Sequence, residues 1–279
     1  MHFHYFECCL SFYLISYLHK IDLVYSHHIF QKLFVTDLDG TLLGSNDKIS
    51  QKNIKAIRDA VDAGVVVTFA TGRMYCSAVQ YARQADIDVP LITYNGALIK
   101  AASGQIYHEE YIDPAAAEKF VGYCAKKQWY IQVNSNDKLY FPVYLERSAA
   151  YEKSTGIKGN TVGWQELGKK TENVAKMLFV TGNFAGDSLS ENEQEENEII
   201  SEMTQKFNGK VLLVKSKKGL IEVINPNVSK ANALLILAEQ FGFKTDEIMA
   251  VGDANNDLPM LKAAGKSAAM GNAADNIKD

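Results

Sequence analysis

The segment DLDGT at residues 37–41 places two carboxylates, Asp37 and Asp39, one residue apart. Side chains alternate along an extended chain, so we expect both carboxylates on the same side of the backbone. Two carboxylates this close repel each other, and a divalent cation would neutralise them. Asp and Gly are also common in simple acidic turns. The position directly after an apolar run nevertheless favours a metal site, and Gly40 allows the chain to turn sharply.

A second acidic motif, GDANND at residues 252–257, also follows an apolar run. Its carboxylates are Asp253 and Asp257, and its amides are Asn255 and Asn256. Hard oxygen ligands of this kind suit Mg²⁺, which keeps several waters and takes one or two carboxylates. A calcium-binding loop is the alternative, but the glycine and the closing glutamate that such a loop requires are missing.

Other motifs offer groups that suit an anion. Thr71, Gly72 and Arg73 precede a predicted helix, and a hydroxyl, a free amide and a guanidinium beside a helix N-terminus suit a phosphate. A simple helix cap is the alternative. Lys230 begins another predicted helix and supplies a positive charge, although alone it would be an ordinary surface lysine. The segment NGA at 95–97 is a weak signal by itself.

These motifs lie next to predicted elements that alternate along the chain. Apolar runs predict strands at 32–38, 65–70, 91–94 and 248–251, and helical spacing predicts helices at 51–63, 74–84 and 230–241. A short helix at 258–264 and a strand at 267–270 follow. Apolar strands alternating with helices indicate a parallel sheet covered on both faces. Ligands bind at the carboxyl ends of such strands, so the motifs are expected to form one site.

The middle of the chain has a different pattern. A hairpin is predicted at 97–111, turning at Ser103 and Gly104. Helices at 114–127 and 191–207 and strands at 130–133, 139–143, 176–181 and 210–215 follow it. Pro142 places the strand at 139–143 at a sheet edge. This stretch indicates an inserted α+β domain, and we expect the strand at 220–224 to return the chain to the parallel sheet.

Composition excludes several classes of protein. The 279 residues are 47% hydrophobic and 22% charged, with a formal net charge of -4, so a nucleic-acid-binding surface is not expected. The four cysteines, Cys8, Cys9, Cys76 and Cys124, show no C-x-x-C spacing. A zinc site or a disulfide framework is therefore not expected, and free thiols suit a reducing cytoplasm.

The first 31 residues contain an apolar run at 8–18 that is shorter than the about 20 residues a membrane-spanning helix needs. The segment also lacks the basic start and small-residue cleavage site of a signal peptide. We therefore expect residues 1–31 to be a non-native or disordered extension. A membrane anchor is the alternative.

Taken together, the motifs resemble those of the haloacid dehalogenase superfamily: DLDGT at 37–41, ATGR at 70–73, VSK at 228–230 and GDANND at 252–257. With NGA at 95–97 and an insertion before Lys230, the chain resembles the Cof-type branch over residues 32–279. The resemblance implies a Rossmann-like α/β core at 32–111 and 219–279 and an inserted α+β cap at 112–218. It also implies a Mg²⁺-dependent phosphatase that acts on a small phosphorylated metabolite, such as a sugar phosphate. From composition and the short apolar run we expect this enzyme to be cytoplasmic, with no nucleic-acid or membrane partner.

The resemblance also implies roles for the motif residues. Asp37 would attack phosphorus and form an aspartyl-phosphate, while Asp39 would protonate the leaving oxygen and then activate water. Mg²⁺ would be held by Asp37, the backbone carbonyl of Asp39 and Asp253. Asp257 would orient Lys230 or a metal-bound water. The phosphate-binding set implied by the resemblance consists of Thr71, Gly72, Arg73, Lys230 and Asn256.

Two departures from the family pattern concern Ala231 and the end of the chain. Ala231 stands where relatives usually have Gly, and relatives usually continue beyond position 279 with a further strand and helix, so we expect a truncated C-terminus. Two other functions fit the same motifs: a phosphomutase of this superfamily, or a non-catalytic binding protein on the same fold. The intact set of Asp37, Asp39, Lys230 and Asp253 argues against the binding protein. The physiological substrate and the oligomeric state stay open.

Overall fold

The computed structural model describes residues 32–181, 184–185, 188–189, 193–217 and 219–278. The chain divides into two compact units. We call residues 32–108 together with 229–278 the core unit, and residues 109–228 the inserted unit. The extension expected at residues 1–31 lies outside the described residues. None of the described helices is both long and apolar enough to cross a membrane.

The core unit is built on a four-stranded sheet with the order β15-β14-β1-β2. All neighbouring strands in it are parallel, which confirms the predicted α/β class. A second sheet has the order β3-β4-β5 and contains the predicted hairpin. A parallel bridge between Ala70 and Ile92 joins the end of β2 to β3. The strands of this unit are β1 (Lys32–Thr36), β2 (Val65–Phe69), β3 (Leu91–Thr93), β4 (Leu98–Lys100), β5 (Ile106–Glu109), β14 (Ile248–Gly252) and β15 (Lys266–Ala269).

Two helices of the core unit, α2 and α8, begin at a serine that caps the helix. The Ser50 hydroxyl accepts a hydrogen bond from the backbone N–H of Asn53, and Ser229 caps α8 in the same way. Gly64, with φ +84°, lets the chain leave α2 for β2. The helices are α2 (Gln51–Asp62), α3 (Tyr75–Ala85), α8 (Lys230–Phe241), α9 (Leu258–Ala263) and α10 (Asp275–Lys278).

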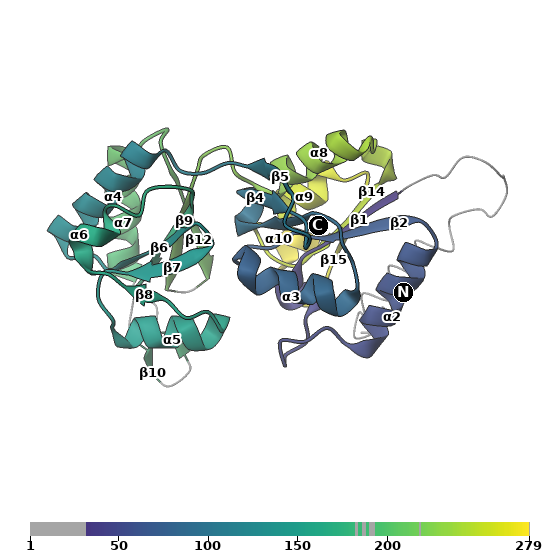
Figure 1. Ribbon diagram of the computed structural model, residues 1–279, viewed down its shortest axis with the longest axis horizontal. Helices are drawn as coiled ribbons and strands as arrows, with labels where there is room; N and C mark the ends of the chain where they lie inside the picture. Colours follow the sequence, from purple (N-terminus) through teal and green to yellow (C-terminus); the bar gives the residue numbers. More distant parts are fainter. Residues whose placement is uncertain (1–31, 182–183, 186–187, 190–192, 218, 279) are drawn as a thin grey trace. The chain divides into compact units, whose positions relative to one another are not determined.

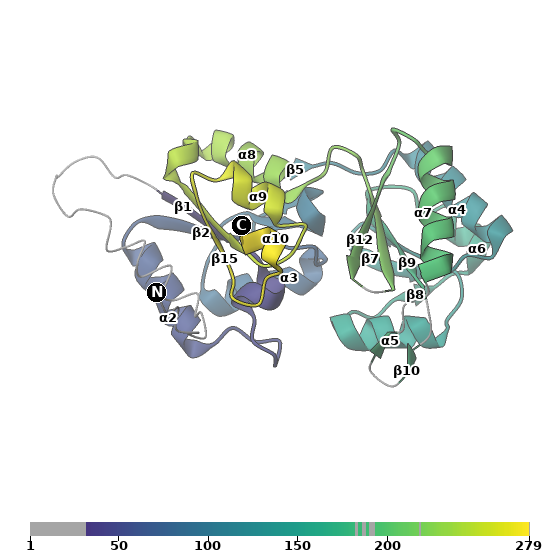
Figure 2. The ribbon, with the colours of Figure 1, turned by 180° about the vertical axis from the view of Figure 1, so that it is seen from behind.

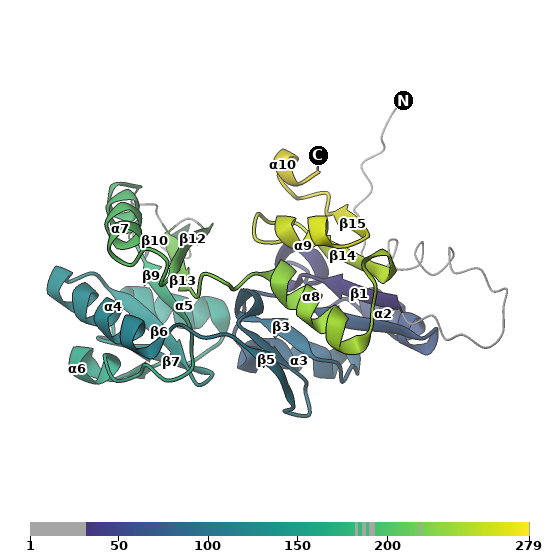
Figure 3. The same cartoon turned by 90° about the horizontal axis from the view of Figure 1, so that it is seen from above.

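Helices cover both faces of the parallel sheet. Figure 1 shows α8 on one side of β1 and β2, and α2 and α3 on the other. Leu33 and Val35 of β1 pack in one buried cluster with Leu234 and Leu237 of α8. Strands β1 and β14 are far apart in the sequence but lie side by side (Figure 3), in the register Leu33 to Ile248. This pairing brings the polar segments after both strands to one edge.

The inserted unit contains a mostly antiparallel sheet with the order β12-β13-β9-β6-β7-β8. Its strands are β6 (Ile131–Ser135), β7 (Lys138–Phe141), β8 (Asn160–Thr161), β9 (Val174–Val180), β12 (Leu212–Lys217) and β13 (Leu220–Ile224), with a separate short pair, β10 (Phe184–Ala185) and β11 (Ser188–Leu189). Its helices are α4 (Pro114–Lys127), α5 (Glu146–Thr155), α6 (Gly163–Leu167) and α7 (Glu193–Lys206). Helices α5 and α6 have no counterpart among the sequence-based predictions.

Two details of this sheet differ from expectation. Strand β13, which we expected in the parallel sheet of the core, pairs with β12 and β9 instead. The inserted unit therefore extends to residue 228 rather than 218. Pro142 does not put β7 at a sheet edge, because β7 pairs with both β6 and β8. The strand ends at Phe141, so the missing N–H of Pro142 removes no bond from the ladder.

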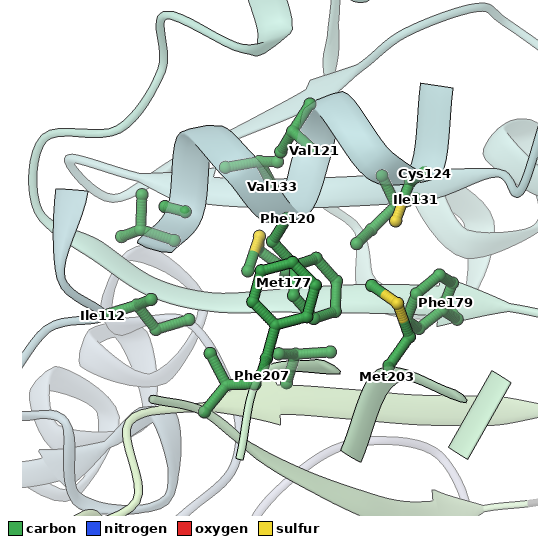
Figure 4. Close-up of a cluster of buried hydrophobic side chains, with 14 of the residues drawn as sticks. Ile112, Phe120, Val121, Cys124, Ile131, Val133, Met177, Phe179, Met203 and Phe207 are labelled. Atoms are coloured by element: carbon green, nitrogen blue, oxygen red, sulfur yellow. The ribbon is translucent and has the colours of Figure 1, made fainter. Parts of the chain in front are cut away.

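The core of the inserted unit lies between its sheet and helices α4 and α7, which run on the same side of the strands in Figure 2. Figure 4 shows Phe120 of α4 at the centre of this cluster. Its ring lies 4.8 Å from that of Phe207 and 5.8 Å from that of Phe179 on β9, measured between ring centroids. Such burial gives this unit a hydrophobic core of its own.

Candidate active site

Asp37 is the first residue after β1 and lies at the edge where β1 and β14 end. Its backbone N–H donates to the carbonyl of Val251 on β14 at 3.0 Å. Strand β1 ends at Thr36 rather than Leu38, because the chain turns immediately after Asp37. Asp253 follows the last residue of β14, so parallel pairing brings the two predicted acidic motifs together.

A tight turn, η1 (Leu38–Leu42), carries the chain away from the sheet. Gly40 has φ +81°, and a Cβ atom there would lie 2.3 Å from Oδ2 of Asp253. Both the backbone conformation and the close approach therefore require glycine. The Thr41 hydroxyl donates to Oδ1 of Asp253 at 2.9 Å, which fixes that carboxylate against the turn.

Lys230 is the central cation of the site. Its side chain is only 1% exposed, and Nζ donates to Oδ1 of Asp37 at 2.6 Å and to Oδ1 of Asp257 at 2.5 Å. Oδ2 of Asp257 accepts from the backbone N–H groups of Asp253 at 3.0 Å and Ala254 at 2.9 Å. Asp257 thus joins the lysine to the turn after β14, and Lys230 is a buried partner of two carboxylates rather than a surface lysine.

The electrostatic balance of the site leaves negative charge in excess. Burial raises the pKa of Asp37 to about 7, with Asp257 and Asp39 adding to the effect and Lys230 opposing it. Burial also raises the pKa of Asp253. Burial alone would lower the pKa of Lys230, but Asp37 and Asp257 outweigh it and keep the ammonium charged. One ammonium therefore faces several carboxylates, and a bound cation would stabilise their ionised forms.

The donor set fits a hard divalent cation. Asp37, Asp253 and Asp257 each offer a carboxylate oxygen, and these oxygens lie within 4.8 Å of one another. An oxygen-only set suits Mg²⁺ or Mn²⁺ better than a softer metal. The carboxylate of Asp39 is not in this group, because it turns towards Arg73.

The predicted phosphate-binding segments meet beside this cluster. Thr71 is fully buried, and its hydroxyl accepts from the backbone N–H of Arg73 at 3.1 Å. Asn256 donates from Nδ2 to Oδ1 of Asn95 at 3.0 Å, so the motifs at 95–97 and 252–257 are in contact. A Cβ on Gly72 would lie 3.0 Å from the same Oδ1. The segments after β2, β3 and β14 therefore meet beside the carboxylate cluster, as expected for the carboxyl ends of strands in one sheet.

Arg73 occupies a position that the sequence did not indicate. Its role in lining the phosphate site stays a prediction, and its Nε and Nη2 donate to the two oxygens of Asp39, at 2.9 and 2.7 Å. The same guanidinium also binds Asp47, which no sequence motif singled out. A guanidinium is drawn to carboxylates in bidentate geometry, and two of them lie within its reach here.

Asn272 was also missed by the sequence analysis. Its Nδ2 donates to the carbonyl of Gly40 and to Oδ2 of Asp253, both at 3.0 Å. The residue lies beyond β15, so it reaches the site only through the fold. Nothing in the local sequence, GNAAD, distinguishes it from an ordinary turn.

The α/β fold and the acidic site at its strand ends are those of a haloacid dehalogenase-like hydrolase. The model of the haloacid dehalogenase-like hydrolase family matches residues 34–279, and the chain belongs to this family. It is 30% identical over 271 residues to the 5-amino-6-(5-phospho-D-ribitylamino)uracil phosphatase YwtE of Bacillus subtilis, covering 89% of this chain and 90% of that protein.

A second phosphatase relative and a solved structure with the same fold agree with membership of this family. The chain is 32% identical over 265 residues to phosphatase YwpJ of B. subtilis, covering 88% of this chain and 92% of that protein. The crystal structure of TM0651 from Thermotoga maritima superposes with a TM-score of 0.77 at 27% identity, covering 88% of this chain and 89% of that one. The predicted family and enzyme class, a phosphoric monoester hydrolase, are thereby confirmed.

Proposed function

We propose that the protein is a Mg²⁺-dependent phosphatase that hydrolyses a small phosphorylated metabolite through an aspartyl-phosphate on Asp37. The observation that carries this proposal is the buried cluster in which Lys230 binds Asp37 and Asp257 at the carboxyl ends of β1 and β14. The relative YwtE is named for action on a phosphorylated ribitylaminouracil, which supports a small phosphomonoester as the substrate class.

The first chemical step transfers the phosphoryl group to Asp37. A carboxylate oxygen of Asp37 bonds to phosphorus while the bond from phosphorus to the leaving oxygen breaks. Asp39 gives its proton to that oxygen, so the product leaves as a neutral alcohol. Lys230 holds the Asp37 carboxylate in place and adds positive charge beside the developing negative charge.

The second step releases phosphate. Asp39 accepts a proton from a water molecule, whose oxygen bonds to phosphorus while the bond to Asp37 breaks. Thr71, Lys230 and Asn256 would hold phosphate oxygens during both steps. Mg²⁺ held by Asp37, Asp253 and the backbone carbonyl of Asp39 would supply the charge that the phosphate oxygens require.

The inserted unit is proposed to act as the cap that selects the substrate. The motif residues of the core handle only the phosphoryl group, which leaves recognition of the rest of the substrate to the inserted unit, residues 109–228. We also place the reaction in the cytoplasm. The four cysteines show no spacing typical of a disulfide framework, which supports a reducing compartment.

Phosphate release from p-nitrophenyl phosphate tests the proposal. We expect release with Mg²⁺, none in EDTA, and none from Asp37→Asn with Mg²⁺. Asp59→Asn is the matched control, because it removes a carboxylate from an exposed ion pair with Lys55 on α2. Release should not require a sugar bisphosphate activator, which a phosphomutase would need. Full activity of Asp37→Asn would overturn the assignment of the nucleophile.

A further inference from the structure

Arg73 binds two carboxylates of the core unit through one guanidinium. Nε and Nη2 form a bidentate pair with Asp39, and Nη2 also lies 2.5 Å from Oδ1 of Asp47. The side chain of Arg73 is 15% exposed, whereas those of Asp39 and Asp47 are 41% and 58% exposed. Asp39, the proposed proton donor, therefore shares its cationic partner with a residue outside all the motifs.

Tyr81 of α3 completes this network from the buried side. Its hydroxyl accepts from Nη1 of Arg73 at 2.9 Å and donates to Oδ2 of Asp47 at 2.9 Å. The guanidinium carbon lies 5.2 Å from the centre of the Tyr81 ring. Burial and the bond to Asp47 raise the pKa of Tyr81 to about 12, so the hydroxyl keeps its proton at neutral pH.

The backbone of Asp47 is held by a turn in which Arg73 takes no part. In this turn the backbone N–H of Asp47 donates to the carbonyl of Gly44 at 3.0 Å, and the N–H of Gly44 donates to Lys48 at 3.0 Å. Leu43 and Ile49 pair across the base of this turn. The turn and the buried Tyr81 thus form a fixed support on which the guanidinium rests.

We propose that Asp47 and Tyr81 are positioning residues that act through Arg73 to hold Asp39 for proton transfer. This inference rests on the proposed function. An arginine side chain has several rotatable bonds, and fixing them costs conformational entropy. The contacts with Asp47 and Tyr81 already restrict the Arg73 side chain, so its guanidinium faces Asp39 in the bidentate geometry. Without them, Arg73 would be held by Asp39 alone, and the half-exposed carboxyl would move more freely.

The geometry is compatible with Asp39 acting as an acid. A protonated carboxyl group keeps one oxygen that accepts hydrogen bonds. Arg73 can therefore retain one oxygen of Asp39 while the other passes its proton to the leaving oxygen. A purely structural role, in which the network only ties the turn to α3, predicts something different. Loss of Asp47 would then affect all substrates equally.

The test compares phenyl phosphate with p-nitrophenyl phosphate, which has nearly the same shape but a weakly basic leaving group that hardly needs a proton. The measured quantity is the ratio of kcat/KM for the two substrates, since kcat/KM includes the steps up to transfer onto Asp37. Asp47→Asn and Tyr81→Phe should each lower kcat/KM for phenyl phosphate, divided by kcat/KM for p-nitrophenyl phosphate, about 3- to 10-fold. This is a part of the about 10²- to 10⁴-fold that a positioned proton donor contributes. Asp59→Asn, the exposed ion-pair control, should leave the ratio unchanged.

A double variant tests whether the loss of Asp47 lowers the kcat/KM ratio through Asp39. In an Asp39→Asn background, Asp47→Asn should not lower the ratio further, because the donor is already gone. An unchanged ratio in both single variants, or a further fall in the Asp39→Asn background, would overturn the inference while leaving the proposed function intact. Failure of the wild-type protein to release phosphate from either substrate would overturn both. Thermal unfolding of each variant verifies the fold, and Tyr81→Phe, which removes one hydroxyl, decides the question if Asp47→Asn does not fold.

Discussion

Replacing the proposed nucleophile should stabilise the protein when no metal is bound. The pKa of Asp37 is raised from 3.8 to about 7 in the folded chain, chiefly by burial. The native state therefore binds this proton more tightly than the unfolded state does. It follows that the ionisation of Asp37 lowers stability as the pH rises from about 4 to about 7. Asn at this position resembles the protonated carboxyl and does not titrate.

The size of the effect follows from the shift in pKa. At about 1.4 kcal/mol per pKa unit, the shift corresponds to about 4 kcal/mol as an upper limit. Asp37→Asn should thus match wild type at pH 4 and exceed its free energy of unfolding by about 1–4 kcal/mol at pH 7 in EDTA. The difference should grow steadily between these two pH values.

Adding Mg²⁺ at pH 7 should make wild type more stable than Asp37→Asn. A cation at Asp37 and Asp253 favours the ionised carboxylate, so wild type should gain more stability from the metal than Asp37→Asn does. Urea unfolding at several pH values measures the free energy of unfolding of wild type and of Asp37→Asn, each in EDTA and in Mg²⁺. The exposed-pair variant Asp59→Asn should change stability by less than about 1 kcal/mol under every condition. An Asp37→Asn protein less stable than wild type at pH 7 in EDTA would refute the reasoning.

Three other outcomes are expected. Zn²⁺ should not replace Mg²⁺ after EDTA treatment in the phosphate-release assay, because the carboxylate cluster offers only oxygen ligands; full activity with Zn²⁺ would contradict this. After rapid quenching with p-nitrophenyl phosphate, intact-protein mass spectrometry should find a phosphate adduct on Asp39→Asn but not on Asp37→Asn, and the opposite pattern would mean that the two roles are exchanged. Gly40→Ala should reduce the affinity for Mg²⁺, measured by calorimetry, since its Cβ would lie 2.3 Å from Asp253 and its φ is +81°; unchanged affinity would show that the turn tolerates a side chain.

The sequence by itself predicted the elements that carry the motifs. Apolar strands followed directly by Asp37, Thr71 and Asp253 indicated a parallel sheet with one site at its carboxyl edge, and the structure has this sheet. The Ser50 cap and the exit at Gly64 were also predictable, because both depend on backbone groups only a few residues away. Local hydrogen bonding and the period of apolar residues are enough for features of this range.

The tertiary structure decided which polar groups meet. Lys230 looks like an ordinary lysine in the sequence, and only the approach of α8 to β1 and β14 buries it between two carboxylates. Strand β13 reads as a core strand, yet pairing with β9 places it in the inserted unit, since an apolar strand fits either sheet. Asp47 and Asn272 stand in unremarkable turns and reach the site through contacts distant in the chain. Such partners depend on how whole elements pack, and a short segment of sequence does not record that.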